Sequence, residues 1–438
     1  MRENYRNLKV VVLGSGTVGS EVVHRLLHER EELGARIGAR LDVVGVAVRD
    51  LSKPRNRDIP AELLHTDAEA LIAGADIVVE LMGGIEPAKS LIVHALESGA
   101  DVISANKALL AAHGPELFDA ATAVGAQLYY EAAVAGAIPI IRPLRDSLAG
   151  DEVQRILGIV NGTTNFILDL MDREGASMES ALATATELGY AEADPTADVG
   201  GYDAQQKAAL LAQLAFHTAI DLDEVGREGI TEISLEQVEA ARDAGYVIKL
   251  LAICERVQGG GVEGVSVRVH PTLVSREHPL AAVHGANNAV FVEASGAGSL
   301  MFYGAGAGGP ETASAVLGDI VSAARRHVAG GPGVAESTHA DLAMVDPGVV
   351  PSRYQIALQV RDEPGVLAQI ASVFSDHGVS VETLNQTVPA ESPSGEELAT
   401  LVIHTHTAPE ASLAETVAQL ADSPVVAAVS GVVRVEGS

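Results

Sequence analysis

The sequence predicts an α/β protein built from three successive parts. Short apolar runs alternate with helical patterns over the first 130 residues, which favours a parallel, doubly wound sheet. Apolar strands mixed with long helices begin near Ile138, which is typical of an α+β domain. The last part has the order strand, helix, strand, strand, helix, strand in about 80 residues, which is the ferredoxin-like βαββαβ arrangement.

Each element is predicted from its periodicity and its bounding residues. Continuous apolar runs with the length of a buried strand indicate strands in the first part. These strands are expected at 8–13, 41–48, 76–81, 101–104 and 127–130. Helical spacing of apolar residues indicates helices between the strands. These helices are expected at 20–34, 87–98 and 115–124.

The same reasoning extends to the other two parts. In the second part, strands are expected at 153–160, 262–269, 289–292 and 300–303, and helices at 164–174, 178–188, 203–220 and 311–327. A stretch rich in Gly, Pro and Asp at 330–351 indicates a linker. The third part should then contain strands at 353–360, 379–388, 398–406 and 425–435, helices at 364–377 and 410–421, and a polar turn at 390–397.

Composition excludes several classes of protein. Asp and Glu total 59 of the 438 residues against 29 Lys and Arg, so the formal net charge is −30 and we expect neither nucleic acid nor anionic membrane as a partner. The single cysteine, Cys254, lies in an apolar run, so we expect a buried thiol and a reducing compartment. The N-terminus lacks a signal peptide's apolar segment, and no run of ~18 apolar residues occurs, so a cytoplasmic protein is expected.

A glycine-rich turn follows the first strand and opens the first helix. Its sequence, GSGTVG, matches the dinucleotide fingerprint, in which the glycines permit a tight turn, a close approach to a pyrophosphate and close packing of helix on strand. The free N–H groups of the helix N-terminus would face the phosphates. We therefore expect a dinucleotide to be bound by Gly14, Gly16, Thr17, Val18 and Gly19.

The second strand ends on a basic residue where this fingerprint expects an acidic one. Arg49 stands at or beside the discriminating position, and Lys53, Arg55 and Arg57 follow in the next loop. This cluster suits the 2′-phosphate of NADP, although it could be a solvated basic loop. Asp50 could still bind a ribose hydroxyl, so the use of NAD as well as NADP stays open.

Four further motifs together resemble the homoserine dehydrogenase family over about residues 8–328. They are SANK at 104–107, the run 131–141, NGTTN at 161–165 and the run 198–207. The resemblance implies the reversible, NAD(P)H-dependent reduction of L-aspartate 4-semialdehyde to L-homoserine, a step toward threonine, methionine and isoleucine that needs no catalytic metal. The run VRDEPGVL at 360–367 resembles the start of an ACT domain, a regulatory module that binds amino acids.

This resemblance implies a division of the chain. Residues 1–137 would form the Rossmann-like NAD(P)-binding domain, with a return segment at about 304–328. Residues 138–303 would form the catalytic and dimerisation domain, 330–352 a linker and 353–438 the ACT domain. We expect a homodimer or homotetramer, and threonine is the expected effector.

Asp203 and Lys207 form the candidate catalytic pair. They are four residues apart at the start of a predicted helix, on a face that continues into Leu210 and Leu214, so we expect them to be partly buried. A lysine so placed can exchange a proton with the oxygen on the carbon that gains or loses hydride. Spacing alone would favour an ordinary surface salt bridge, but the resemblance makes Lys207 the general acid/base.

The resemblance also implies the substrate contacts. Glu192 would bind the substrate's ammonium group, Asp198 would belong to the same acidic pocket, and Thr163 would supply a polar contact. Lys107 would lie near the nicotinamide and the substrate, after a parallel strand. The alternatives are a solvated acidic turn, a helix cap and a surface lysine.

Two more segments receive a role only through the resemblance. A structural Na⁺ would be held by one carboxylate and three backbone carbonyls, from Glu131, Val134, Gly136 and Ile138. Ala135 and Ala137 stand where relatives often carry glycine, which puts the conformation of this loop in doubt. The glycine-rich run at 304–309, with Gly306, would contact the coenzyme, or be a flexible connection.

Two alternative functions are kept beside this interpretation. One is another amino-acid dehydrogenase on the same scaffold, and the other is a non-catalytic amino-acid sensor that uses the ACT domain. The joint presence of Glu192, Asp198, Asp203 and Lys207 argues against both.

Overall fold

The computed structural model describes residues 6–55, 57–259, 262–334, 336, 338–387 and 398–437. The chain forms two compact units. Unit 1 comprises Met1–Gly162, Asp203–Val225 and Ala286–Leu342, and unit 2 comprises Thr163–Tyr202, Gly226–Gly285 and Ala343–Ser438. Within the described residues, no helix has the length and apolar character needed to cross a membrane.

Unit 1 contains a six-stranded sheet in which all neighbouring strands are parallel. The strand order is β3-β2-β1-β4-β5-β6, the order of a doubly wound dinucleotide-binding sheet. The strands are β1 (Arg6–Leu13), β2 (Ala39–Ala47), β3 (Leu64–His65), β4 (Ile77–Glu80), β5 (Asp101–Ser104) and β6 (Leu128–Tyr129). The predicted parallel sheet is confirmed, although the short strand β3 was not predicted.

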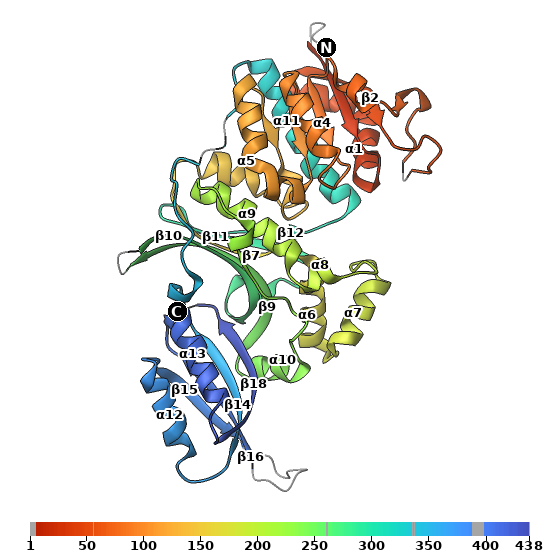
Figure 1. Ribbon diagram of the computed structural model, residues 1–438. Helices are drawn as coiled ribbons and strands as arrows, with labels where there is room; N and C mark the ends of the chain where they lie inside the picture. The colour runs from red at the N-terminus through yellow and green to blue at the C-terminus, as the bar shows by residue number, and fades with distance from the viewer. Residues whose placement is uncertain are drawn as a thin grey trace. The chain divides into compact units, whose positions relative to one another are not determined.

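Two helices from distant parts of the sequence pack together in the core of this sheet. They are α1 (Thr17–His28) and α11 (Gly309–Ala329), which lie side by side in Figure 1. Val22 and Leu26 of α1 share one buried cluster with Val316 and Ile320 of α11 and with strand residues such as Val12. The return of the chain after residue 300 therefore completes the hydrophobic core of the dinucleotide-binding fold.

The remaining helices of this fold differ from the prediction in three places. They are α2 (Arg30–Ile37), α3 (Ala68–Ile72), α4 (Ala88–Glu97) and α5 (Lys107–Val124). The short helix α3 was not predicted. The helix expected at 20–34 is two helices, because the backbone leaves helical geometry at Glu29. Helix α5 begins at Lys107 instead of residue 115, because Asn106 caps it and Pro115 is accommodated inside the helix.

Unit 1 also contains an antiparallel group of three strands and one long helix. The strands are β7 (Val153–Ile159), β11 (Asn287–Ala294) and β12 (Gly298–Ala305), in the order β12-β11-β7. The helix is α9 (Tyr202–Phe216), which carries the candidate catalytic pair. The expected linker also makes contacts within the unit, since Gly333 N–H donates to the Gly125 carbonyl over 3.0 Å.

Unit 2 contains helices and a long antiparallel hairpin. The helices are α6 (Gly162–Glu174), α7 (Met178–Glu187), α8 (Thr196–Val199) and α10 (Leu235–Asp243). The hairpin strands are β9 (Tyr246–Gly259) and β10 (Val262–Ser275), and the short β8 (Gly226–Arg227) pairs with β10. Strand β9 and helices α8 and α10 were not predicted, whereas α6 and α7 lie where helices were expected.

The C-terminal part of unit 2 has the predicted ferredoxin-like order. Its elements are β14 (Tyr354–Arg361), α12 (Val366–Asp376), β15 (Val381–Thr387), β16 (Leu398–Thr405), α13 (Glu410–Ala421) and β18 (Val426–Val435), with a small pair β13 (Pro351–Ser352) and β17 (Ala408–Pro409). The sheet order is β18-β14-β16-β15, and Ile356, Phe374 and Leu413 lie in one buried cluster. The turn expected at 390–397 lies outside the described residues.

Candidate active site

The glycine-rich turn after β1 has the close contacts that its sequence predicts. Gly14 has a positive φ of 104°, and a Cβ built on it would lie 2.7 Å from the Leu81 carbonyl oxygen. A Cβ on Gly19 would lie 2.2 Å from the Gly14 carbonyl oxygen, whereas a Cβ on Gly16 would meet no atom of the described chain within 4 Å. Two glycines therefore serve the turn and its packing, and Gly16 leaves an open approach to the backbone.

This open approach lies at the N-terminus of α1. Gly16 is the N-cap of the helix and offers no side chain to its first N–H groups, which include those of Thr17 and Val18. These N–H groups and the helix dipole suit a pyrophosphate, so the residues present fit a dinucleotide coenzyme. A Cβ on Gly309 would lie 2.8 Å from Thr17 Cγ2, which shows that the second glycine-rich segment reaches this helix start.

Arg55, rather than Arg49, contacts the glycine-rich turn. Arg55 Nε donates to the Ser15 hydroxyl over 2.9 Å, and its Nη2 donates to the Asp50 carbonyl oxygen over 2.9 Å, while Arg49 is exposed. The Asp50 carboxylate accepts from the Ser52 hydroxyl and backbone N–H, which lower the pKa of Asp50. The cluster of basic residues in the sequence predicted that this loop contacts the coenzyme, but the prediction named Arg49 as the main contact and Arg55 only as a member of the cluster.

A buried carboxylate that the sequence analysis missed lies at the end of β4. Glu80 accepts from the N–H groups of Met82 and Gly83 and from the Ser104 hydroxyl, the last over 2.7 Å. An acidic residue that ends a buried apolar strand was the available signal. Glu80 thus joins the carboxyl end of β4 to that of β5, the edge at which doubly wound sheets bind ligands.

The same edge positions Lys107. Asn106 caps α5 by accepting from Leu109 N–H over 3.2 Å, and its amide donates to the Gly84 carbonyl oxygen over 2.6 Å. Lys107, the first residue of α5, therefore begins directly after the carboxyl end of β5. Its ammonium group lies 2.6 Å from Asp203 Oδ1.

Asp203 connects Lys107 to the candidate general acid/base. Lys207 Nζ donates to Asp203 Oδ2 over 2.8 Å and to the Val160 carbonyl oxygen over 2.7 Å. The Asn161 amide also donates to Asp203 Oδ2, over 2.9 Å. The structure therefore brings Lys107, Asp203 and Lys207 together through one carboxylate.

This group is buried, unlike an ordinary surface salt bridge. Asp203 and Lys207 are 7% and 9% exposed, whereas the side chain of Lys107 is 41% exposed. Burial opposes ionisation of Asp203, but Lys207 and Lys107 outweigh it and hold the pKa of this carboxyl well below its usual range. The site thus holds a permanent carboxylate between two ammonium groups, one buried and one reaching solvent.

The predicted substrate residues of unit 2 lie on neighbouring segments. Thr163, in the first turn of α6, donates its hydroxyl to the Tyr190 carbonyl oxygen over 2.6 Å. This bond ties the start of α6 to the loop that carries Glu192, which is exposed. Asp198 lies half-buried in α8.

Glu131 anchors the predicted cation loop through its side chain. Its carboxylate accepts from the N–H groups of Ile140 and Ile141 and from the N–H and Nε of Arg142, over 2.6–3.0 Å. These four donors compensate the buried charge of Glu131 in the described structure, and its role as a cation ligand stays a prediction.

The backbone of this loop is tightly packed. Ala135 adopts a positive φ of 55°, and a Cβ on Gly136 would lie 2.3 Å from the Gly306 carbonyl oxygen. Gly306 in turn packs against Asn288, since a Cβ on it would lie 2.2 Å from Asn288 Cγ. Val134 and Ile138 are buried in the same loop.

Cys254 is buried in β9, and burial raises the pKa of its thiol to about 12. The described residues include no group of three or more His, Cys, Asp or Glu side chains placed to hold a metal ion.

Comparison with protein-family models gives three matches in chain order. A model for the NAD-binding domain of homoserine dehydrogenase matches residues 14–131, one for homoserine dehydrogenase matches 139–321, and one for the ACT domain matches 354–423. Among curated proteins, homoserine dehydrogenase from Corynebacterium glutamicum is 53% identical over 98% of this chain and 95% of its own length. Homoserine dehydrogenase from Mycobacterium tuberculosis is 52% identical over 98% of both chains.

Solved structures agree with these matches. The crystal structure of a homoserine dehydrogenase from Thiobacillus denitrificans is similar with a TM-score of 0.90 and 37% identity over 99% of both chains. A hyperthermophilic archaeal homoserine dehydrogenase in complex with NADPH has a TM-score of 0.61 and 27% identity, covering 74% of this chain and 99% of its own. This chain, an NAD(P)-dependent oxidoreductase with a C-terminal ACT domain, belongs to the homoserine dehydrogenase family.

Proposed function

We propose that Lys207 is the general acid/base in the interconversion of L-aspartate 4-semialdehyde and L-homoserine. The main support for this proposal is the pair of ion pairs that Asp203 makes with Lys107, at the carboxyl end of β5, and with Lys207. The coenzyme would supply or accept the hydride at the reacting carbon. Lys207 would give a proton to the aldehyde oxygen in reduction and take one from the homoserine hydroxyl in oxidation.

Asp203 would position Lys207 for this proton exchange. Its carboxylate and the Val160 carbonyl oxygen hold two N–H bonds of the ammonium group, so the third N–H direction is defined. The charge of Asp203 also compensates the buried ammonium group, which would otherwise be costly to desolvate. Only Lys207 then needs to change protonation during the reaction.

Lys107 would bind substrate rather than transfer the proton. Its greater exposure and its place directly after β5 suit a cation that attracts the substrate's carboxylate to the ligand-binding edge of the sheet. The roles of Glu192, Asp198 and Thr163 in substrate binding are proposed from the family resemblance.

We propose NADP as the preferred coenzyme, bound at Gly14, Gly16, Thr17, Val18 and Gly19. Arg55 would bind its 2′-phosphate, with Arg49 as a second cation, because Arg55 is held at the turn by Ser15. The archaeal relative in complex with NADPH supports a phosphorylated coenzyme. Gly306 would contribute through the second glycine-rich segment.

The effector, the oligomeric state, the compartment and the Na⁺ site are also proposals. Threonine would act at the ACT domain, and the chain would form a homodimer or homotetramer in the cytoplasm. A structural Na⁺ would be held by the Glu131 carboxylate and the backbone carbonyls of Val134, Gly136 and Ile138, and no catalytic step depends on it.

The central test is the change Lys207→Met, which keeps the length and apolar stem of the side chain. We expect kcat for NADPH oxidation with aspartate semialdehyde to fall by about 10³-fold, because a general acid/base contributes roughly 10²–10⁴-fold. Lys89→Met, which removes a lysine paired with Glu116 on α4 and α5, is the control and should keep full activity. A folded Lys207→Met enzyme with near-normal kcat would refute the assignment.

The coenzyme proposal is tested with Arg55→Gln. We expect KM for NADPH to rise about tenfold, equivalent to roughly 1.4 kcal/mol, because one charge-assisted contact to phosphate is lost. KM for NADH should stay nearly constant, as should both constants in the control Arg36→Gln, which removes a surface arginine. Equal increases for both coenzymes would show that Arg55 supports the turn and does not select the phosphate.

A further inference from the structure

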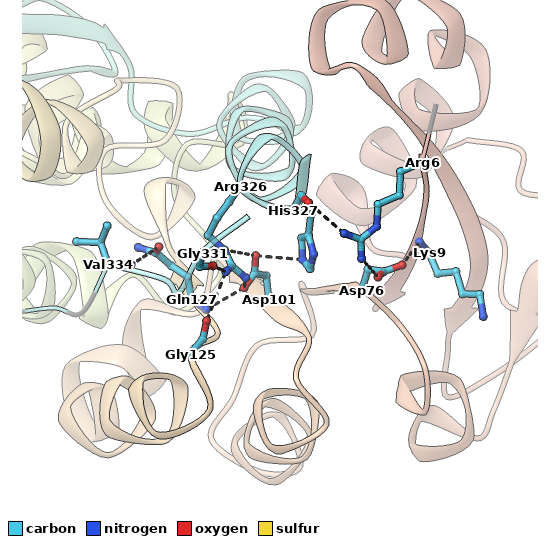
Figure 2. Close-up of polar contacts among 10 residues, drawn as sticks. All are labelled: Arg6, Lys9, Asp76, Asp101, Gly125, Gln127, Arg326, His327, Gly331 and Val334. Atoms are coloured by element: carbon cyan, nitrogen blue, oxygen red, sulfur yellow. Dashed lines mark hydrogen bonds and ion pairs between the residues drawn. The ribbon is translucent and has the colours of Figure 1, made fainter. Parts of the chain in front are cut away.

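A cavity of about 230 Å³ lies within unit 1 at the amino ends of β5 and β6. Its lining includes Arg142, Arg145, Ser322, Arg326 and Val334. Asp101 begins β5 and bonds Arg326, so this is the opposite edge of the sheet from the glycine-rich turn and Lys107. Figure 2 shows Arg326 of α11 reaching Asp101 and the backbone around Gly331. The proposed active site does not use this cavity.

Three guanidinium groups converge on this cavity in a chain with a net charge of −30. Each is held in place by one carboxylate. Arg326 pairs with Asp101, Arg142 with Glu131 and Arg145 with Glu336. Asp101 and Glu131 are nearly inaccessible, at 0% and 1% exposure, so these acids lie behind the arginines. The paired carboxylates therefore fix the orientation of the guanidinium groups.

Two of these arginines have N–H groups beyond those bonded to their partner carboxylates. Arg142 bonds Glu131 through Nε, and its Nη1 and Nη2 lie against Gly318 of α11, where a built Cβ would approach them to 2.6 and 2.7 Å. Glycine at this position thus leaves room for the guanidinium group. The side chain of Arg145 is 8% exposed, and its buried Nε has no hydrogen-bond partner among the described residues. A buried donor without a partner is costly, and an oxyanion is its natural acceptor.

The outer wall of the cavity is the segment that follows α11. Val334 N–H donates to Gln127 Oε1 over 2.9 Å, and Arg326 Nη1 donates to the Gly331 carbonyl oxygen over 2.9 Å (Figure 2). Arg326 therefore belongs both to the cavity and to its wall. A ligand that contacts the cavity would stabilise this wall.

We propose that this cavity binds a small oxyanion, a carboxylate or a phosphate, through Arg142 and Arg145, with Arg326 supplying a third positive charge in the lining. Its volume suits a ligand of a few non-hydrogen atoms, and planar guanidinium groups match both oxyanions in a bidentate manner. The exposed carboxylate of Asp146 also lines the cavity and favours a ligand that carries a cationic group beside its oxyanion, such as an α-amino acid.

The test compares ligands and variants of the full chain. Inorganic phosphate, succinate and L-alanine are titrated against NaCl of equal ionic strength, while hydrogen exchange at residues 333–334 is followed by mass spectrometry. At a concentration near 10 Kd, binding that requires a closed wall should slow this exchange about tenfold. The ligand that produces a saturable effect distinguishes phosphate, dicarboxylate and amino acid as the source.

Changes at Ser322 locate the effect. Ser322→Leu fills the cavity and should abolish the response, whereas Ser322→Ala, the matched control, should keep it, with kcat unchanged in both. Ser322→Glu, which places a carboxylate beside the arginines, should also abolish it and guards against poor folding of the leucine variant. The proposal is overturned if no ligand slows exchange saturably, or if the response persists in folded Ser322→Leu or Ser322→Glu.

Discussion

The two units each bury a lysine, and they stabilise it in different ways. In unit 1, Lys207 of α9 lies 2.8 Å from the carboxylate of Asp203. In unit 2, Lys249 of β9 is fully buried and donates to Asn165 Oδ1 over 2.9 Å and to the Val283 carbonyl oxygen over 2.6 Å. One ammonium group thus has a charged partner and the other has neutral acceptors.

The difference shows that the pKa of a buried group depends on its charged partners as well as on burial. Burial lowers the pKa of Lys249 to about 8, and the more distant Asp169 and Asp172 only partly oppose this. In the other unit, Asp203 stays ionised because two ammonium groups compensate the loss of solvent. A buried residue that must stay charged needs a partner of opposite charge close to it.

The largest expected effect is on the pH dependence of stability at Lys249. Its pKa is about 8 in the folded protein and 10.5 unfolded, so between these values the unfolded state binds more protons. The free energy of unfolding should therefore rise with pH from 8 to 10.5, by up to about 3 kcal/mol from this group. Lys249→Met should lack this rise, which denaturant unfolding at several pH values measures.

Subtracting the Lys249→Met curve from the wild-type curve removes the titration of other groups. Lys53→Met, a change at an exposed lysine, is the control and should retain the wild-type slope. A difference curve that is flat between pH 8 and 10.5 would mean that Lys249 is as well compensated as a surface lysine. The contrast between the two units would then disappear.

The second prediction removes the charge that distinguishes unit 1. Asp203→Asn gives Lys207 a neutral acceptor of the same shape, as Lys249 has. We expect kcat to fall about thirtyfold, roughly 2 kcal/mol, because a hydrogen bond to a charged group is lost in a buried site. Steady-state assay measures this, with Asp119→Asn on the exposed face of α5 as a control.

The acid limb of stability should change in the same variant. The pKa of Asp203 lies below its ordinary value of 3.8, so its carboxylate stabilises the wild type above that pH, and the contribution is lost as pH falls through the lower folded value. Asp203→Asn should lack this acid-dependent loss. Wild-type kcat in a folded Asp203→Asn enzyme would show that Lys207 needs no charged partner.

The sequence predicted Lys207 and Asp203 but not Lys249, and the reason is physical. The first pair is local, since residues four apart on a helix share a face whatever the rest of the fold does. Lys249 contacts Asn165 and Val283, which are distant in sequence, and its strand β9 was not recognised because a continuous apolar run suits several environments. Contacts made by distant segments leave no periodic signal.

The same distinction explains the rest of the comparison between prediction and structure. The glycine-rich turn and the βαββαβ order are local patterns, and both are confirmed. The early start of α5 depends on the cap at Asn106, which a proline at 115 concealed. Two hydrogen bonds, from Arg142 to Glu131 and from Arg55 to Ser15, depend on the conformation of loops. They could not be derived from the spacing of residues in the sequence.

The smallest effect is expected at Lys107, which shares Asp203 with Lys207 but reaches solvent. Lys107→Gln should change the free energy of unfolding by less than about 1 kcal/mol, because an ion pair with an exposed partner contributes little and Lys207 still compensates Asp203. We expect kcat/KM for aspartate semialdehyde to fall about tenfold through weaker substrate binding. Thermal melts and initial rates measure the two quantities, with Lys9→Gln as the exposed control. A loss of stability as large as that of Asp203→Asn would show that Lys107, and not Lys207, compensates the charge of Asp203. The buried salt bridge between Asp203 and Lys207 would then not explain how unit 1 differs from unit 2.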